Sequence, residues 1–207
     1  MNLPNNFIEL SLDCCRKTDF NKEAELLRIE LDKASKENDS QSYIKNNKKW
    51  FIPLSILKNY DFGHHFACVV PEYSLGNEYR VDYLLIGKNS LGYQFVFVEF
   101  EDVNVDFRNK TSNSATEKVR KGITQLKDWR RWIDRNKNYF EGKEGIKEFC
   151  RNIPSWGFYY CLVVGRRERM DNISNMIRGE MQDDFRGLKI ISYDRLIENV
   201  SLMHNGI

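Results

Sequence analysis

Three acidic residues stand out because each interrupts or ends an otherwise apolar run. Asp82 lies inside the run Tyr79–Gly87, while Glu99 and Glu101 close the run Tyr93–Glu101. Both runs have strand-like composition, and strand side chains alternate between faces, so Glu99 and Glu101 are expected to point the same way. Carboxylates at the end of a buried strand are costly unless a cation or hydrogen bonds compensate them. Hard carboxylate oxygens suit Mg²⁺ or Mn²⁺, which makes a metal site one interpretation of this pattern.

The two runs are expected to form a hairpin through the turn at residues 88–92. If the turn closes near Gly87 and Tyr93, Asp82 falls opposite one of residues 97–99, and the sequence does not fix which. Asp82 and Glu99 can therefore be close neighbours at one end of a buried sheet. The alternative is a sheet edge at which the acids simply meet water.

The bulk composition favours a single globular domain. The chain has 207 residues, of which 41% are hydrophobic and 30% charged, enough to bury a core. A net charge of +2 gives no global field that demands a polyanionic partner. Five cysteines without a CxxC pair, and only three histidines, argue against a disulfide framework and a zinc site. The first residues lack the basic and apolar regions typical of a signal peptide, and no apolar run approaches membrane-spanning length, so we expect a cytoplasmic protein with no membrane partner.

The hydrophobic pattern predicts an α/β fold with the element order α-β-β-β-α-β-α-β-α. The expected helices cover residues 21–36, 41–50, 114–135, 169–181 and 193–203. The expected strands cover residues 66–71, 79–87, 93–101, 158–164 and 188–192. A capping box, Ser114 followed three residues later by Glu117, is expected to open the longest helix.

That longest helix carries an apolar stripe and is otherwise the most basic helix of the chain. Apolar residues recur at steps of three or four, at Val119, Ile123, Leu126, Trp129 and Ile133. Basic residues on the other faces are typical of a surface that meets backbone phosphates of nucleic acid, although a solvated helix has the same composition. The residues expected to bind nucleic acid are Lys118, Lys121, Lys127, Arg130 and Arg131.

Several short motifs, together with Asp82 and Glu99, resemble a known family. The motifs are Gln41–Ile44, Val96–Asp102, Gln125–Trp129 and Leu188–Ile197. An acid on one hairpin strand, a second acid on the next strand and a helix packed across the sheet resemble the PD-(D/E)xK nuclease superfamily. Within it, the chain is most similar to the C-terminal domain of Shedu-type anti-phage defence proteins, over roughly residues 37–200.

The resemblance implies both a fold and an activity. The implied fold is restriction-endonuclease-like, a mixed central sheet flanked by helices over residues 37–207, preceded by an N-terminal helical extension over residues 1–36. The implied activity is a metal-dependent DNA endonuclease serving defence against phage. A chain of this length leaves little room for a separate sensor domain, so control by a partner protein or by a homo-oligomer is expected.

The resemblance also implies roles for individual residues. Asp82 and Glu99 would hold Mg²⁺ or Mn²⁺, helped by the Phe100 carbonyl, and Gln125 would orient the site from the long helix. An acid at the start of the N-terminal helix often joins the site in this family. The residues in that place are Glu37 and Asp39.

The chain departs from the family pattern at position 101, where the superfamily has lysine and this sequence has Glu101. Glutamate can act as a base or a metal ligand, but it cannot stabilise negative charge on phosphate. Glu101 would then recruit a second ion, or Lys118 or Lys121 would replace the missing lysine. The third alternative is a nuclease-fold module that binds nucleic acid or a partner without cutting it. A glycoside hydrolase is disfavoured, because acids two residues apart on one strand do not flank a bond well.

Overall fold

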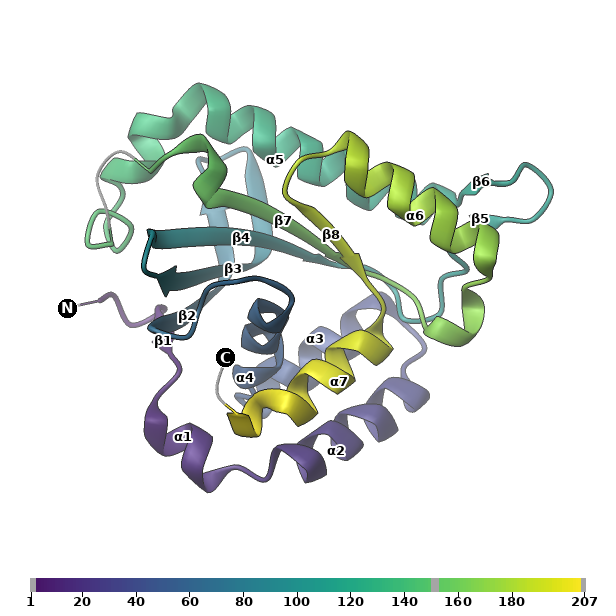
Figure 1. The fold of residues 1–207 in the computed structure, drawn as a ribbon, viewed down its shortest axis with the longest axis horizontal. Coiled ribbons are helices and arrows are strands. Elements are labelled where there is room, and N and C mark those ends of the chain that lie inside the picture. The colour runs from purple at the N-terminus through teal and green to yellow at the C-terminus, as the bar shows by residue number, and fades with distance from the viewer. Residues whose placement is uncertain (1–2, 150–152, 206–207) are drawn as a thin grey trace.

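The computed structural model describes residues 3–149 and 153–205, and its centre is a six-stranded sheet (Figure 1). The strands, in spatial order, are β1 (Ile8–Glu9), β2 (Phe66–Leu75), β3 (Tyr79–Asn89), β4 (Gly92–Phe100), β7 (Phe158–Val163) and β8 (Leu188–Ile191). The first four strands pair antiparallel, and β4, β7 and β8 run parallel. The predicted mixed sheet and the α/β class are therefore confirmed.

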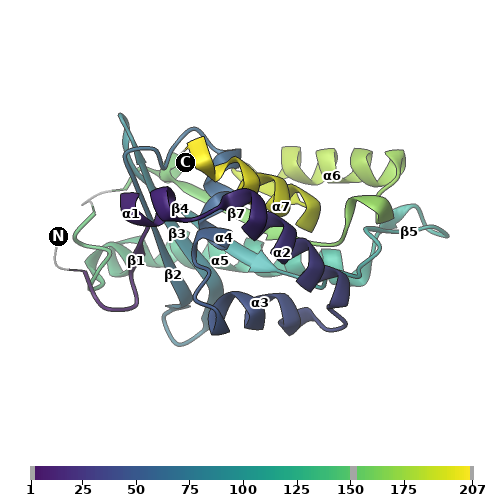
Figure 2. The ribbon, with the colours of Figure 1, turned by 90° about the horizontal axis from the view of Figure 1, so that it is seen from below.

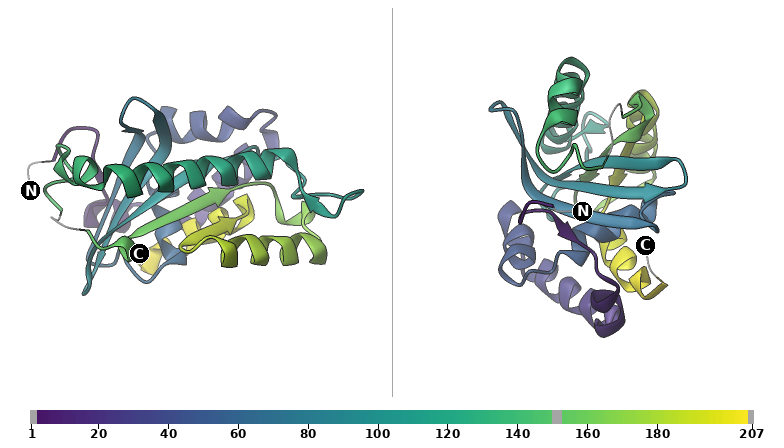
Figure 3. Two further views of the ribbon diagram at one scale, coloured as in Figure 1. Left: turned by 90° about the horizontal axis from the view of Figure 1, so that it is seen from above. Right: turned by 90° about the vertical axis from the view of Figure 1, so that its left-hand side faces the viewer.

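Helices cover both faces of this sheet. Helices α5 (Glu117–Gly142) and α6 (Asn172–Asp184) lie side by side on one face (Figure 3). The other face carries α1 (Leu12–Lys17), α2 (Phe20–Lys33), α3 (Glu37–Asn46), α4 (Phe51–Leu54) and α7 (Tyr193–Ser201) (Figures 1 and 2). Because both faces are covered, the central strands are apolar on both sides rather than alternating.

The alternation of side chains along β4 divides the interior into two cores. Phe97 packs in the core under α5 and α6 with Trp129, and its neighbour Val98 packs in the other core with Leu196. Both cores reach the strand ends where the acids lie. The predicted stripe of the long helix is confirmed, since every apolar residue of it is buried.

The residues predicted to form an N-terminal extension pack against the rest of the fold. Ile8 of β1 pairs with Val69 at the edge of the sheet. Leu27 and Leu31 of α2 belong to the same core as α7. Part of the predicted extension thus contributes strand β1 as well as helices.

The capping box predicted at the start of the long helix is wrong. Helix α5 begins at Glu117 with Thr116 as its N-cap, while Ser114 and Ala115 form strand β6 (Ser114–Ala115). This strand pairs with β5 (Arg108–Asn109) in a small hairpin. The Thr116 hydroxyl donates to the Asp106 carbonyl at 2.9 Å. Ser114 therefore pairs with Asn109 in a hairpin instead of capping the helix.

Helix α3 begins four residues earlier than predicted. The segment from Glu37 to Ser40 was expected to separate two helices, and it forms the first turn of α3 instead. The Asp39 carboxylate accepts hydrogen bonds from the backbone N–H groups of Ser35 and Lys36, at 2.8 and 2.9 Å. An acid that captures N–H groups in this way stabilises a helix start. The polar residues from Glu37 to Ser40 therefore form the start of α3 and do not separate two helices.

Two further expectations concern cysteines and membranes. Cys14, Cys15, Cys68 and Cys161 are free thiols, and Cys150 lies outside the described residues. Within residues 3–149 and 153–205, no helix combines the length and the apolar character needed to cross a membrane.

Candidate functional site

Asp82 and Glu99 come together where the β3–β4 ladder ends. The hairpin pairs Tyr83 with Val98, so the same register brings Asp82 beside Glu99. Of the three registers that the sequence left open, this is the one that makes the acids neighbours. Beyond Val98 the regular pairing stops, and the Phe100 backbone N–H donates to Asp82 Oδ2 at 2.8 Å. This hydrogen bond fixes the end of β4 to the side chain of Asp82 on β3.

Helix α3 supplies a second donor to the same carboxylate. Gln41, which is buried, donates from Nε2 to Asp82 Oδ2 at 2.9 Å. Two donors on one oxygen fix the orientation of the carboxylate. Asp39, which the resemblance offers as a site acid, instead accepts hydrogen bonds at the helix start from the backbone N–H groups of Ser35 and Lys36. These hydrogen bonds lower the pKa of Asp39. The side chain of Glu37 lies outside the described residues. Among the described side chains of α3, Gln41 is the one that forms a hydrogen bond with Asp82.

These groups line a cleft of about 390 Å³, called the acid cleft below. Its lining is entirely polar or charged and consists of Asn38, Gln41, Ser42, Lys45, Glu72, Asp82 and Glu99. A lining without apolar side chains suits an ion or a phosphate group better than an apolar ligand.

Glu72 places a third acid beside this pair, on β2. Pro71 pairs with Tyr83 and Tyr73 with Val81, which sets Glu72 opposite Asp82. Glu72 has a φ of 52°, a left-handed conformation that is unusual for a residue other than glycine.

The Glu72 carboxylate is neutralised by two cations. Lys45 Nζ lies 2.6 Å from its Oε1, and Arg80 binds its other oxygen. The hydrogen bond from Lys45 lowers the pKa of Glu72. Among the described residues that line the acid cleft, Lys45 is the one with a positive charge.

The donor set of the acid cleft fits a hard divalent ion. Asp82 and Glu99 offer carboxylate oxygens, while Phe100, whose carbonyl the resemblance adds, is not among the described residues that line the cleft. Over the described part of the chain, no three His, Cys, Asp or Glu side chains are grouped to hold an ion. Mg²⁺ is commonly bound by one or two carboxylates while it keeps several waters, whereas a structural zinc site needs four protein ligands. Two neighbouring carboxylates in this polar cleft therefore suit Mg²⁺ or Mn²⁺.

Glu101 lies outside the acid cleft, under α5. Its side chain is 5% exposed, and a methyl group built on Gly122 of α5 would lie 3.3 Å from Glu101 Oε1. The same methyl group would come within 2.8 Å of Leu162 Cδ1. Glycine at this position lets α5 approach the sheet and cover Glu101. The structure thus places the residue that replaces the family lysine beneath a helix.

Replacing Gly122 by valine is expected to destabilise the fold by about 1–3 kcal/mol, the usual cost of overpacking a core. The added methyl groups must displace Leu162 and Glu101, which are both buried. Gly179→Val is the matched control, because Gly179 is also helical and a methyl group there meets nothing within 4 Å. Urea denaturation of both variants measures the difference. Equal stability of the two would contradict the close contact.

Tyr193, the first residue of α7, connects the strand end to α3. Its hydroxyl donates to the Glu101 carbonyl at 2.6 Å, and the Ser40 hydroxyl lies 3.2 Å from the same phenol oxygen. Since the phenol proton goes to the carbonyl, Ser40 is the donor in the second contact. Ser40 precedes Gln41, so this buried chain of hydrogen bonds helps to hold Gln41 against Asp82.

Tyr193→Phe is expected to cost about 1–3 kcal/mol of folding free energy, because it removes the phenol hydroxyl that bonds both the Glu101 carbonyl and the Ser40 hydroxyl in the protein interior. Tyr139→Phe is the control, since Tyr139 is 57% exposed. Thermal denaturation followed by circular dichroism measures both. A Tyr193→Phe protein as stable as the control would show that this contact contributes little.

Gln125 and Lys121 lie in a different hollow from the acids. That hollow, of about 490 Å³, is bounded by α5 and by Tyr79 at the start of β3. Gln125, which the resemblance expects to orient the site, therefore lines a hollow that contains neither Asp82 nor Glu99.

The basic side chains predicted on α5 are exposed, but several are already engaged. Lys118 pairs with Asp102 at 2.8 Å, and Arg131 pairs with Asp128. Neither Lys118 nor Lys121 is among the described residues that line the acid cleft. Lys45 occupies the cleft instead, from the opposite face of the sheet.

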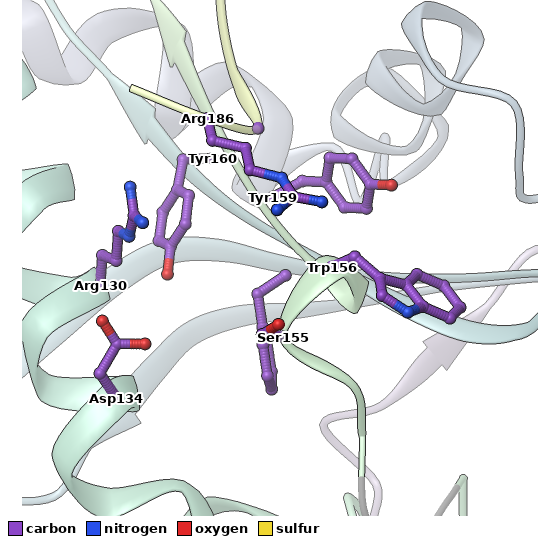
Figure 4. A pocket seen from close by; sticks show the side chains of 9 residues that line it. Arg130, Asp134, Ser155, Trp156, Tyr159, Tyr160 and Arg186 are labelled. Carbon is purple, nitrogen blue, oxygen red and sulfur yellow. The ribbon is translucent and has the colours of Figure 1, made fainter. Parts of the chain in front are cut away.

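Arg130 lies in a pocket of about 180 Å³ at the other end of the sheet, near the start of β7 (Figure 4). Figure 4 shows its guanidinium and the Asp134 carboxylate on the same side of the pocket as the Tyr160 ring, with Trp156 across from them. Its guanidinium also lies 5.3 Å from the centre of the Phe185 ring. Arg130 is therefore remote from the strand ends that carry Glu99.

Comparison with known proteins identifies a family for this chain. No curated protein matches the chain. A family model described as the C-terminal part of the Shedu protein SduA matches residues 34–197 of the 207. The match begins just before α3 and ends within α7, so it spans every element that lines the acid cleft. The chain therefore belongs to the family of the Shedu protein SduA C-terminal domain.

Proposed function

We propose that this protein is a metal-dependent endonuclease that hydrolyses phosphodiester bonds of DNA, in the cytoplasm, as part of an anti-phage defence system. The observation that carries the proposal is the acid cleft, where Asp82 and Glu99 from adjacent strands meet Gln41 and Lys45 from α3. Family membership and the mixed sheet with helices on both faces support a restriction-endonuclease-like fold.

Several residues in and beside the acid cleft have defined tasks in this proposal. Asp82 and Glu99 hold the ion, and Gln41 and the Phe100 N–H keep the Asp82 carboxylate in one orientation. A bound Mg²⁺ or Mn²⁺ supplies polarisation of the phosphoryl group and a more acidic water. The basic residues of α5 that remain exposed, such as Lys121 and Lys127, would make backbone contacts that weaken with salt.

Lys45 takes the role that the family assigns to the lysine at position 101. Its ammonium lies in the acid cleft, 2.6 Å from Glu72, and can stabilise negative charge that develops on the phosphate. Gln41 and Lys45 are four residues apart on α3, so both side chains project from one face of the helix. A phosphodiester entering the cleft would compete with Glu72 for this ammonium.

A non-cutting module remains the second candidate, and one observation favours it. Glu101 is buried under α5, and the lysine of the cleft is already paired with a carboxylate. If Glu72 keeps Lys45 when DNA is bound, the cleft holds an ion and a phosphate without the positive charge that cleavage needs.

A cleavage assay separates the two candidates. Circular and linear DNA, and RNA of matched length, are incubated with Mg²⁺, Mn²⁺ or EDTA, and DNA binding is measured in parallel by fluorescence anisotropy. The proposal predicts cutting of DNA that needs either metal and stops in EDTA. Binding without cutting under both metals would replace the endonuclease by the non-cutting module. Cutting of RNA alone would keep the chemistry and change the substrate.

A further inference from the structure

A separate pocket, called the arginine pocket below, is lined by residues of α6, β8 and the start of α7. Figure 1 shows where these three elements lie in the fold. It measures about 330 Å³. Three guanidinium groups converge on it, from Arg167 before α6, Arg178 on α6 and Arg195 on α7. The amide side chains of Asn175 and Gln182 also line it. None of these residues belongs to the acid cleft.

The arginine pocket carries an excess of positive charge. Glu198 pairs with Arg167 at 2.6 Å and with Arg195 at 3.2 Å, so one carboxylate is shared by two guanidinium groups. No hydrogen bond or ion pair joins Arg178 to another described residue. Burial, followed by the charges of Arg195 and Arg167, lowers the pKa of Arg178. Three like charges around one cavity are unfavourable unless an anion joins them.

The start of α7 adds to this field. Ser192 is the N-cap of α7 and lines the arginine pocket, and its hydroxyl accepts a hydrogen bond from the Arg195 N–H at 3.3 Å. The N-terminus of a helix favours negative charge because its N–H dipoles point outward. The helix and the guanidinium groups therefore favour the same kind of ligand.

We propose that the arginine pocket binds a phosphate group, held by Arg167, Arg178 and Arg195. Guanidinium groups form paired hydrogen bonds with phosphate oxygens, and a phosphate adds negative charge to a pocket in which one carboxylate faces three cations. The phosphate belongs either to a small phosphorylated molecule or to a nucleic acid backbone. The site does not depend on cleavage in the acid cleft.

The position of the arginine pocket makes a backbone phosphate possible. Ile191, which lines it, pairs with Val163, and Val163 pairs with Phe100, the residue after Glu99. Phe100 and Ile191 thus lie at the same end of the sheet, two strands apart, or roughly 10 Å at normal strand spacing, so the arginine pocket and the acid cleft open at the same end of the strands.

The test is titration of the full chain with inorganic phosphate, and separately with a short DNA duplex, at constant ionic strength made up with sodium chloride. Calorimetry and anisotropy measure affinity. Arg178→Gln is expected to weaken the binding of one or both probes by roughly tenfold, the value of one charge-assisted contact. Glu198→Gln is expected to act in the opposite direction, because it removes the carboxylate that competes for Arg167 and Arg195.

Arg28→Gln is the matched control, since Arg28 is an exposed arginine of α2 that pairs with Glu25. Circular dichroism and the melting temperature show that each variant is folded, and Arg178→Gln is expected to be at least as stable as wild type because it relieves repulsion. If Arg178→Gln loses phosphate binding, the arginine pocket is a site for a small phosphorylated molecule. If Arg178→Gln loses only DNA binding, the pocket contacts the DNA backbone. Failure of wild type to bind either probe, or equal affinities of Arg178→Gln and the control, would overturn the proposal.

Discussion

Asp82→Asn and Glu99→Gln are each expected to reduce metal-dependent DNA cleavage by at least about a thousandfold. Each removes one of the two carboxylates that would hold the ion in the acid cleft. Metal ions contribute several kcal/mol of transition-state stabilisation, and each 1.36 kcal/mol corresponds to a tenfold change in rate. Single-turnover cleavage of linear DNA in Mg²⁺ measures the loss.

The same two variants are expected to keep or raise the melting temperature. Glu99 is 8% exposed and lies beside the half-buried Asp82, so neutralising either acid removes repulsion between neighbouring carboxylates. Loss of activity without loss of stability distinguishes a functional acid from a structural one. Asp106→Asn is the control, because Asp106 is an exposed acid of the loop after β4 and pairs loosely with Arg169, at 3.4 Å. Wild-type cleavage by Asp82→Asn or Glu99→Gln would exclude the acid cleft as the site of chemistry.

Lys45→Met is expected to lower the cleavage rate by about a hundredfold while leaving DNA affinity almost unchanged. Removal of one group that stabilises transition-state charge typically costs a factor of about 10² to 10³. Methionine keeps the apolar length of the side chain and removes its charge. The lost ion pair with Glu72 is partly exposed, so the folding free energy should change by at most about 1 kcal/mol.

Lys33→Met controls for the loss of one surface charge, because Lys33 pairs with Glu30 at 2.9 Å on α2, as Lys45 pairs with Glu72. The informative comparison is the maximal rate at saturating DNA against the affinity for DNA. If Lys45→Met weakens binding and leaves the maximal rate intact, Lys45 is a phosphate contact rather than a catalytic residue. If Lys45→Met behaves as Lys33→Met does, the role proposed for Lys45 is wrong.

The sequence contained most of the information needed for the sheet and for the two acids. Asp82 and Glu99 interrupt strands that are apolar on both faces, and a buried strand tolerates a carboxylate only where something compensates it. The hairpin narrowed the partner of Asp82 to three positions, and the turn geometry decided among them. One acid pair at a strand end was therefore predictable without knowledge of the tertiary structure.

The rest of the acid cleft depends on how α3 packs, which no local pattern specifies. Gln41 and Lys45 stand at helical spacing, but the sequence does not say that this face of α3 meets Asp82. Glu72 was missed because its place opposite Asp82 requires the β2–β3 register. For the same reason Lys118 and Lys121 were natural choices for a displaced lysine, since only the fold shows which helix reaches the acids.

The measurement that tests the central claim most directly is Mn²⁺ binding by calorimetry, with wild type beside the double variant Asp82→Asn/Glu99→Gln. It needs neither a known substrate nor a known trigger. The account predicts a saturable Mn²⁺ site in wild type that the double variant loses, while Asp106→Asn retains it. Equal Mn²⁺ binding by wild type and the double variant would contradict the account, because the acid cleft would then not be the metal site.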